Sequence, residues 1–121
     1  MFKEPLTTIL ENTEGSLGVI LMGLDGIAVE KALTPAGREA NLDVAATEIS
    51  SLVRSAQRIG RNLGLGETQE MTLSLDNVKL VARLVSAEYF IVLALEPSGN
   101  LGRGRYELRK AELSLAREFQ F

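Results

Sequence analysis

The chain of 121 residues is 45% hydrophobic and 24% charged, and its formal net charge is −3 at pH 7. This length predicts one domain, 1–121, with a real hydrophobic core, and the slightly acidic balance argues against nucleic acid as a partner. The sequence has no Cys and no His, which excludes disulfides, thiolate metal sites and every nucleophile that depends on a histidine base.

The first third of the sequence predicts a helix followed by a β-hairpin. Residues 2–12 place apolar side chains at helical spacing, and Gly15 suits the end of this helix. Residues 16–22 are almost uniformly apolar, so we expect a central strand that is buried on both faces. Asp25-Gly26 predicts a tight turn into a second strand at 27–32, because Gly accepts the positive φ that such a reversal needs.

The middle of the chain contains the clearest helical pattern. The Pro and Gly of residues 34–39 predict a loop, and Asn41 or Asp43 is expected to cap the helix that follows. This helix covers 42–63 and ends at the glycines beyond it. Steps of three and four residues connect most of its apolar positions, which are Leu42, Ala45, Ile49, Leu52, Val53, Ala56, Ile59 and Leu63.

Three strands and a final helix are predicted for the rest of the chain. Residues 67–74 alternate like a strand with one face in water, and two further strands follow at 79–84 and 89–95. The last helix spans 101–119, with a buried stripe formed by Leu108, Ala111, Leu115 and Phe119. Short links between neighbouring strands predict an antiparallel sheet. The fold class is therefore α+β, in the order helix, two strands, helix, three strands, helix.

Three arginines share one stripe of the long helix. Arg54, Arg58 and Arg61 are spaced at i, i+4 and i+7, away from the apolar positions. Guanidinium groups on a rigid helix can hold an acidic partner surface or a phosphate, so these residues are our candidates for partner binding. The alternative is a solvated helix face, in which Arg58 and Arg61 favour the negative end of the helix dipole.

A second group of cations lies at the start of the last helix. Its members are Arg103, Arg105, Arg109 and Lys110. The helix dipole disfavours cations there, which points to an acidic partner, a phosphate or an anionic membrane. The simpler interpretation is that Gly102 and Gly104 keep this stretch loop-like, while Glu107 and Glu112 neutralise the helix proper.

No catalytic or nucleotide-binding motif is present. The segment 60–66 is rich in Gly, but it lacks the Lys-Ser/Thr of a phosphate-binding loop and follows a helix instead of preceding one. Asp25 and Asp76 are turn residues, and Glu30 lies beside Lys31 on a strand, so no carboxylate pair is favoured for catalysis. We therefore predict no catalytic residue, no metal ligand and no cofactor.

The sequence gives no sign of a leader or a membrane segment. Residues 1–5 lack the basic region followed by an apolar core that a secretory signal requires. No apolar run approaches the roughly 20 residues that are needed to span a bilayer. We expect a cytoplasmic protein without a membrane span.

The order of elements resembles the roadblock/dynein light chain family, in particular its bacterial MglB-like branch. The Asp25-Gly26 hairpin and the ending Gly99-Asn-Leu-Gly-Arg-Gly-Arg-Tyr-Glu-Leu-Arg-Lys-Ala111 carry this resemblance. It covers essentially the whole chain, although no single motif is diagnostic. It implies a five-stranded antiparallel sheet with the long helix on one face and the two terminal helices on the other. It also implies a homodimer in which the long helix and the third strand meet their symmetry mates.

The third strand has the character of an open sheet edge. It contains no Pro and no Lys, and Met71 and Leu73 leave one side apolar. With the family resemblance, this gives Leu52, Ala56, Met71 and Leu73 as candidates for the dimer interface. The alternative is a short solvated edge that is guarded by Glu67 and Glu70.

Members of this family bind small GTPases, so the resemblance implies a non-catalytic regulator. It would bind a Ras-like small GTPase and modulate its GTPase cycle or its localisation. Any acceleration of hydrolysis would come from reorganising the switch residues of the GTPase rather than from a supplied arginine, for which Arg54 and Arg58 are the candidates. One alternative is a scaffold or adaptor subunit of a larger assembly, without effect on hydrolysis. A small-molecule sensor is another, for which the aliphatic core offers few polar groups.

Overall fold

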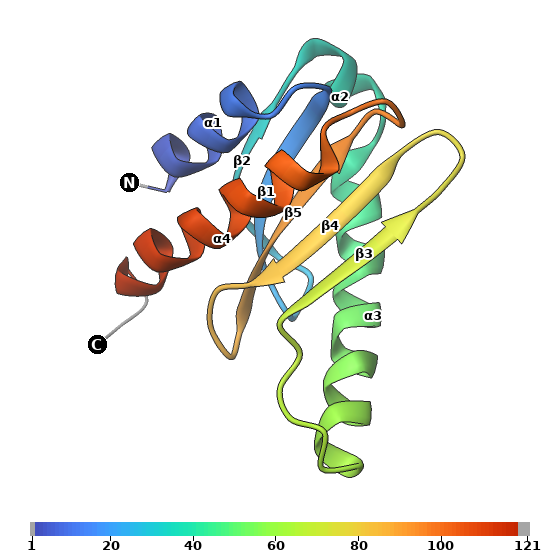
Figure 1. Ribbon diagram of the computed structural model, residues 1–121, viewed down its shortest axis with the longest axis vertical. Coiled ribbons are helices and arrows are strands. Elements are labelled where there is room, and N and C mark those ends of the chain that lie inside the picture. The colour runs from blue at the N-terminus through green and yellow to red at the C-terminus, as the bar shows by residue number, and fades with distance from the viewer. Residues whose placement is uncertain (1, 119–121) are drawn as a thin grey trace.

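The computed structural model describes residues 2–118 as one layer of β-sheet between helices (Figure 1). Its elements are α1 (Lys3–Asn12), β1 (Ser16–Gly23), β2 (Ala28–Leu33), α2 (Pro35–Glu39), α3 (Leu42–Asn62), β3 (Glu70–Ser74), β4 (Lys79–Leu84), β5 (Tyr89–Leu95) and α4 (Leu101–Glu118). The five strands are antiparallel and lie in the order β2-β1-β5-β4-β3. The predicted α+β class and strand arrangement are confirmed, with β2 and β3 as the two edges.

Helices cover both faces of the sheet, and each face has its own core. The terminal helices α1 and α4 lie on one face and α3 crosses the other, as Figure 1 shows. Alternate residues of β1 point to opposite faces: Val19 belongs to the α1/α4 core and Ile20 to the α3 core. Every residue from Gly18 to Gly23 is buried. The prediction of a central strand buried on both faces is therefore confirmed.

The predicted loop at 34–39 is wrong, because the segment folds into the short helix α2. Thr34 caps this helix by accepting a hydrogen bond from the backbone N–H of Gly37 on its Oγ1, at 3.0 Å. Pro35 follows in the first turn, where its fixed φ suits a helix and its missing N–H costs no bond. The Pro and Gly that predicted a loop are here parts of a capped helical turn.

The long helix α3 begins and ends close to the predicted residues, but its cap differs. Asn41 occupies the N-cap position with a φ of 52°, and its side chain makes no capping hydrogen bond. Asp43 does not cap either; its Oδ2 lies 2.8 Å from the Nζ of Lys31. At the other end, Gly64 takes a φ of +67°, so the predicted glycine stop is confirmed.

The strand β3 starts at Glu70, three residues later than predicted. The chain beyond α3 first folds back onto the helix, with the N–H of Leu65 donating to the carbonyl of Gly60 at 2.7 Å. Arg61 then holds Glu67 through an ion pair of 3.0 Å. These bonds hold the chain near the end of α3 as far as Glu67, and Gln69 then meets β4 by accepting a hydrogen bond from the N–H of Leu84 at 3.1 Å.

The glycines at the start of α4 lie inside the helix, which contradicts the loop-like interpretation. The side chain of Asn100 accepts a hydrogen bond from the N–H of Arg103 at 3.0 Å, so the helix already begins at Leu101. Gly104 lets α4 approach β5, since a Cβ there would lie 2.6 Å from Cδ2 of Leu93. The predicted stripe of Leu108, Ala111 and Leu115 is buried, whereas Phe119 lies outside the described residues.

Within residues 2–118, none of the helices combines the length and the apolar character that a bilayer crossing demands.

Replacing the two glycines of the first turns of α4 should shift stability in opposite directions. Gly102→Ala should stabilise the protein by about 0.5–1 kcal/mol, because the new Cβ meets nothing closer than 3.8 Å and Ala is the better helix former. Gly104→Ala should destabilise it by about 1–3 kcal/mol, since Leu93 is buried and must move. Urea unfolding of both variants measures the difference, and two equal shifts would contradict the close approach of α4.

Candidate interaction surfaces

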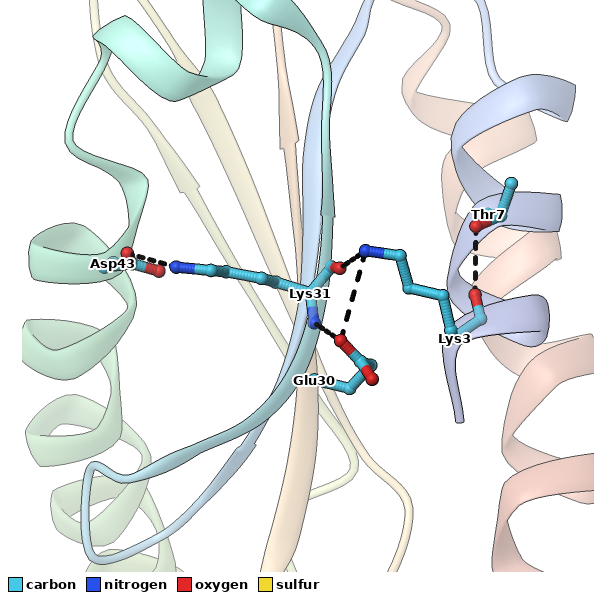
Figure 2. Close-up of polar contacts among 5 residues, drawn as sticks. All are labelled: Lys3, Thr7, Glu30, Lys31 and Asp43. Atoms are coloured by element: carbon cyan, nitrogen blue, oxygen red, sulfur yellow. Dashed lines mark hydrogen bonds and ion pairs between the residues drawn. The ribbon is translucent and has the colours of Figure 1, made fainter. Parts of the chain in front are cut away.

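The edge at β2 is closed by side chains of the chain itself. Figure 2 shows Lys31 between α1 and α3, with its ammonium on Asp43 and its backbone facing Lys3 and Glu30. The N–H of Lys31 donates to Oε1 of Glu30 at 3.0 Å, and its carbonyl accepts a hydrogen bond from Nζ of Lys3. Because these backbone groups are already bonded, an incoming strand finds the middle of this edge occupied.

The edge at β3 is open by comparison. This strand pairs with β4 on one side, and Met71 and Leu73 pack partly buried against the α3 core. The acidic residues that could guard the edge are engaged elsewhere in the chain. Glu67 binds Arg61, and Glu70 lies 2.6 Å from Arg105 and 3.5 Å from Arg83. Within residues 2–118, the outer backbone of β3 therefore lacks the side-chain hydrogen bonds that protect β2.

An apolar stripe on α3 also lies outside the core. Leu52, Ile59 and Leu63 are 44%, 57% and 68% exposed, and Ala56 lies between them at the same helical spacing. Leu42, Ile49 and Val53 instead pack on the sheet. The helix therefore carries more apolar residues than its packing on the sheet uses. Below, this set of Leu52, Ala56, Ile59 and Leu63 is called the apolar stripe.

The three arginines of α3 are all exposed, but they differ in what they bind. Arg54 donates to the carbonyl of Leu24 and lies 3.4 Å from Oγ of Ser50, while Arg58 donates to Oγ of Ser55 at 2.9 Å. Among the described residues, neither has a carboxylate partner within ion-pair distance.

Arg61 is different from the other two because it holds the segment that follows α3. Its Nε and Nη2 reach the two carboxylate oxygens of Glu67 at 3.3 and 3.0 Å. The hydrogen bond and the charge of Glu67 raise the pKa of Arg61 above its ordinary value. Of the three predicted partner-binding residues, Arg54 and Arg58 therefore retain charge that no carboxylate of residues 2–118 neutralises.

The apolar stripe and the arginines lie on opposite flanks of α3. Positions two residues apart, such as Leu52 and Arg54, are separated by roughly 200° around a helix. Arg54 reaches the turn between β1 and β2, so its flank faces the β1 side of the sheet. The apolar stripe consequently faces the β3 side, next to the open edge.

The β1–β2 turn belongs to the arginine surface, which the sequence did not reveal. Leu24 accepts the hydrogen bond of Arg54, and a Cβ on Gly26 would touch Thr47 and Ser50 at 3.4 and 3.5 Å. Ile27, just beyond the turn, is 67% exposed. Thirty positions separate Leu24 from Arg54, and only the fold brings them together. Arg54, Arg58 and the turn 24–27 are called the arginine flank below.

A hollow of about 460 Å³ lies between the end of α3, the segment 67–69 and the β4–β5 turn. Charged and polar side chains dominate its lining, including Arg61, Arg83 and Glu112. Gln57 also lines it; within residues 2–118 its buried Nε2 has no hydrogen-bond acceptor. This open hollow differs from the enclosed apolar site between sheet and helix that a small-molecule sensor would need.

Known proteins resemble this chain over nearly its full length. A model of the Roadblock/LC7 domain matches residues 3–95. MglC from Myxococcus xanthus is 34% identical, covering 95% of this chain and 96% of its own, with a TM-score of 0.68. The gliding protein MglB from Thermus thermophilus is 23% identical, covering 94% of this chain and 84% of its own, with a TM-score of 0.83.

Myxococcus xanthus MglB is 15% identical, covering 98% of this chain and 94% of its own, with a TM-score of 0.85. At these identities the two MglB structures share the fold with this chain. No curated protein sequence gives a significant match. Because the domain model spans residues 3–95 and the identity to MglC extends over almost the whole of both chains, this protein belongs to the Roadblock/LC7 domain family.

Proposed function

We propose that this protein is a homodimeric, cytoplasmic regulator that binds a Ras-like small GTPase and modulates its GTPase cycle or localisation. The observation that supports this most is the division of α3 into two flanks. One flank is apolar and lies beside an open strand edge, and the other carries Arg54 and Arg58 without carboxylate partners among residues 2–118. Self-association through the first leaves the second free for a partner.

The proposed dimer joins the apolar stripe and β3 to their symmetry mates. Pairing β3 with its copy satisfies the outer N–H and C=O groups of the strand and gives a ten-stranded sheet. Packing the stripe against its copy removes apolar surface from water, at about 25 cal/mol per Å². One MglB structure has a tetrameric arrangement, so self-association is known for a protein of this fold.

The proposed GTPase site is the arginine flank, which a dimer presents twice. Guanidinium groups bind carboxylates and phosphates with defined geometry, and the exposed Ile27 adds an apolar contact beside them. Arg54 is anchored to the carbonyl of Leu24, so its guanidinium is held at the surface of this chain. This anchoring supports docking that reorganises the GTPase, rather than insertion of an arginine into its active site.

A second candidate function is that of a scaffold or adaptor subunit without effect on GTP hydrolysis. The anchoring of Arg54 supports this candidate as well, because a held guanidinium suits binding more than catalysis. A pull-down separates the two functions, because the adaptor is recovered with a larger assembly that contains no GTPase.

The substitution Leu73→Lys should weaken the dimer. It places a charge on the apolar side of β3, where Leu73 lies partly buried beside the proposed interface. We expect the dissociation constant of the dimer to rise about tenfold or more, which multi-angle light scattering at micromolar concentration detects as a fall in mass.

Val29→Lys is the matched control for this experiment, because Val29 is an exposed apolar residue on the other edge strand. Its mass should equal that of the unmodified protein. A monomeric unmodified protein would refute the dimer, and an unchanged mass for Leu73→Lys would place the interface away from β3.

The substitution Arg58→Ala should weaken GTPase binding about fivefold to tenfold, since it removes an exposed charge that the fold does not use for an ion pair in its described part. Candidate Ras-like GTPases from the same organism are titrated by calorimetry, and their GTP turnover is followed with and without this protein. Arg38→Ala serves as control, because Arg38 is an exposed cation on α2, away from the arginine flank.

Changed turnover by the unmodified protein supports the regulator. A complex with unchanged turnover limits the regulator to the localisation of the GTPase, whereas a larger assembly that is recovered by pull-down without a GTPase supports the adaptor. Unchanged turnover and no complex with any of these GTPases by calorimetry or size-exclusion chromatography would refute the regulator.

A further inference from the structure

The outer face of α4 carries most of the positive charge on its side of the sheet. This helix contains five of the 13 Lys and Arg residues of the chain. Four of them flank the solvent-facing line through Tyr106 and Leu113, and these are Arg103, Arg109, Lys110 and Arg117. This face lies across the sheet from α3 (Figure 1) and beyond residues 3–95 of the domain match. It therefore belongs to neither surface described above.

The acidic residues of α4 compensate this charge only in part. Glu107 is turned into the protein, where it is 1% exposed, and its carboxylate lies 3.0 Å from Arg103 and 3.9 Å from Lys110. Glu112 points to the sheet and binds Arg83 at 2.8 Å. The helix thus directs two of its carboxylates inward and leaves its cations outside.

Two of the outer cations have no ion pair at all within residues 2–118. Arg109 and Arg117 are exposed, and none of the ion pairs of this part of the chain includes them. Arg103 and Arg105 add positive charge near the start of the helix, where the dipole is also positive. Ion pairs with Glu107 and Glu70 offset this unfavourable placement of Arg103 and Arg105, so the cations of α4 without an ion pair in residues 2–118 are Arg109 and Arg117.

Exposed apolar groups lie in the middle of this charge. Tyr106 is 50% exposed and Leu113 is 70% exposed, one above the other along the helix. The Arg103 guanidinium and the Lys110 ammonium lie 5.4 and 5.8 Å from the centre of the Tyr106 ring, which holds the ring in place. Tyr and Arg are enriched at the energetic centres of protein interfaces. A tyrosine and a leucine within a rim of cations form a surface of that kind.

We propose that the outer face of α4 is a docking surface for an acidic surface of another protein. Charge complementarity selects this occupant: the rim of four cations matches carboxylates, and Tyr106 and Leu113 match a small apolar contact between them. A membrane-binding helix buries a continuous apolar face in lipid, whereas this face exposes one tyrosine and one leucine among cations. The partner carries Asp and Glu around one or two apolar side chains.

The experiment is a titration of isotope-labelled protein with an acidic helical peptide, followed by NMR. The peptide consists of glutamates with leucines spaced three and four residues apart, which gives one apolar stripe within a negative surface. We expect shifts that are confined to residues 102–117, with binding that weakens as salt is added. Arg109→Glu and Tyr106→Ala should each weaken binding about tenfold.

Arg38→Glu is the matched control, because it makes the same change of charge at an exposed arginine away from α4. It should bind the peptide as the unmodified protein does, and circular dichroism checks that all variants are folded. If Arg38→Glu and Arg109→Glu weaken peptide binding equally, the loss is due to the change in net charge alone, and the proposal is overturned. Shifts elsewhere, or no binding of the peptide, would overturn it too.

Two further measurements test the other occupants of this surface. Vesicles of phosphatidylserine and phosphatidylcholine that bind the protein through Arg109, while the acidic peptide does not, would replace the protein partner by a membrane. A mass above that of a dimer, lost in Arg109→Glu, would identify a second copy of this chain as the occupant. An acidic protein is supported as the occupant if the mass does not exceed that of a dimer, the vesicles do not bind, and the acidic peptide binds through Arg109 and Tyr106.

Discussion

The edges of the β-sheet impose the constraint on which the other features of this protein depend. Helices bury both faces of the five strands. The outer N–H and C=O groups of the edge strands β2 and β3 are then the parts of the sheet that still need hydrogen-bond partners or protection. The chain meets this requirement at β2 with Lys3 and Glu30, which bond the backbone of Lys31. At β3, the nearby carboxylates of Glu67 and Glu70 form ion pairs with arginines and do not bond the strand backbone. With one closed and one open edge, the proposed strand pairing joins two chains and ends there, instead of continuing into a fibre.

The difference between the two sheet edges bears on function, because the two flanks of α3 lie beside different parts of the sheet. In the proposed dimer, α3 needs apolar residues on two sides, toward the sheet and toward a second copy. The proposal accounts for the exposure of Leu52 and Ile59, which continue the apolar pattern of Val53. The flank that remains faces the β1–β2 turn, where Arg54 and Leu24 meet. In the proposed function, assembly and partner binding use different sides of the same helix and do not compete.

Much of this architecture could be predicted from the sequence, because it follows from local patterns. Helical spacing, alternation and the Asp25-Gly26 turn are sufficient for the order of the elements and the antiparallel sheet, and the family resemblance supplies the faces that the helices cover. Some misjudged details have local causes, such as the caps at Thr34 and Asn100, and others depend on partners distant in the chain. Gly102 and Gly104 signal a loop locally, yet α4 needs a small residue where it meets Leu93. The same is true of the candidate surfaces: Arg54, Arg58 and Arg61 look equivalent on one stripe, and only the positions of Leu24 and Glu67 distinguish them.

The charge of α4 is best understood by comparing its two sides. On the inner side, Glu107 and Glu112 are engaged by Arg103, Lys110 and Arg83, and the packing of α4 on the sheet rests on Leu108 and Leu115. A helix whose only role was to bury one face of the sheet would need only these inner contacts. On the outer side, Arg109 and Arg117 have no ion pair within residues 2–118, and a tyrosine and a leucine remain in water. Neither feature serves the packing of α4 on the sheet, and both are typical of an interface, which supports the proposed docking surface on the outer side of α4.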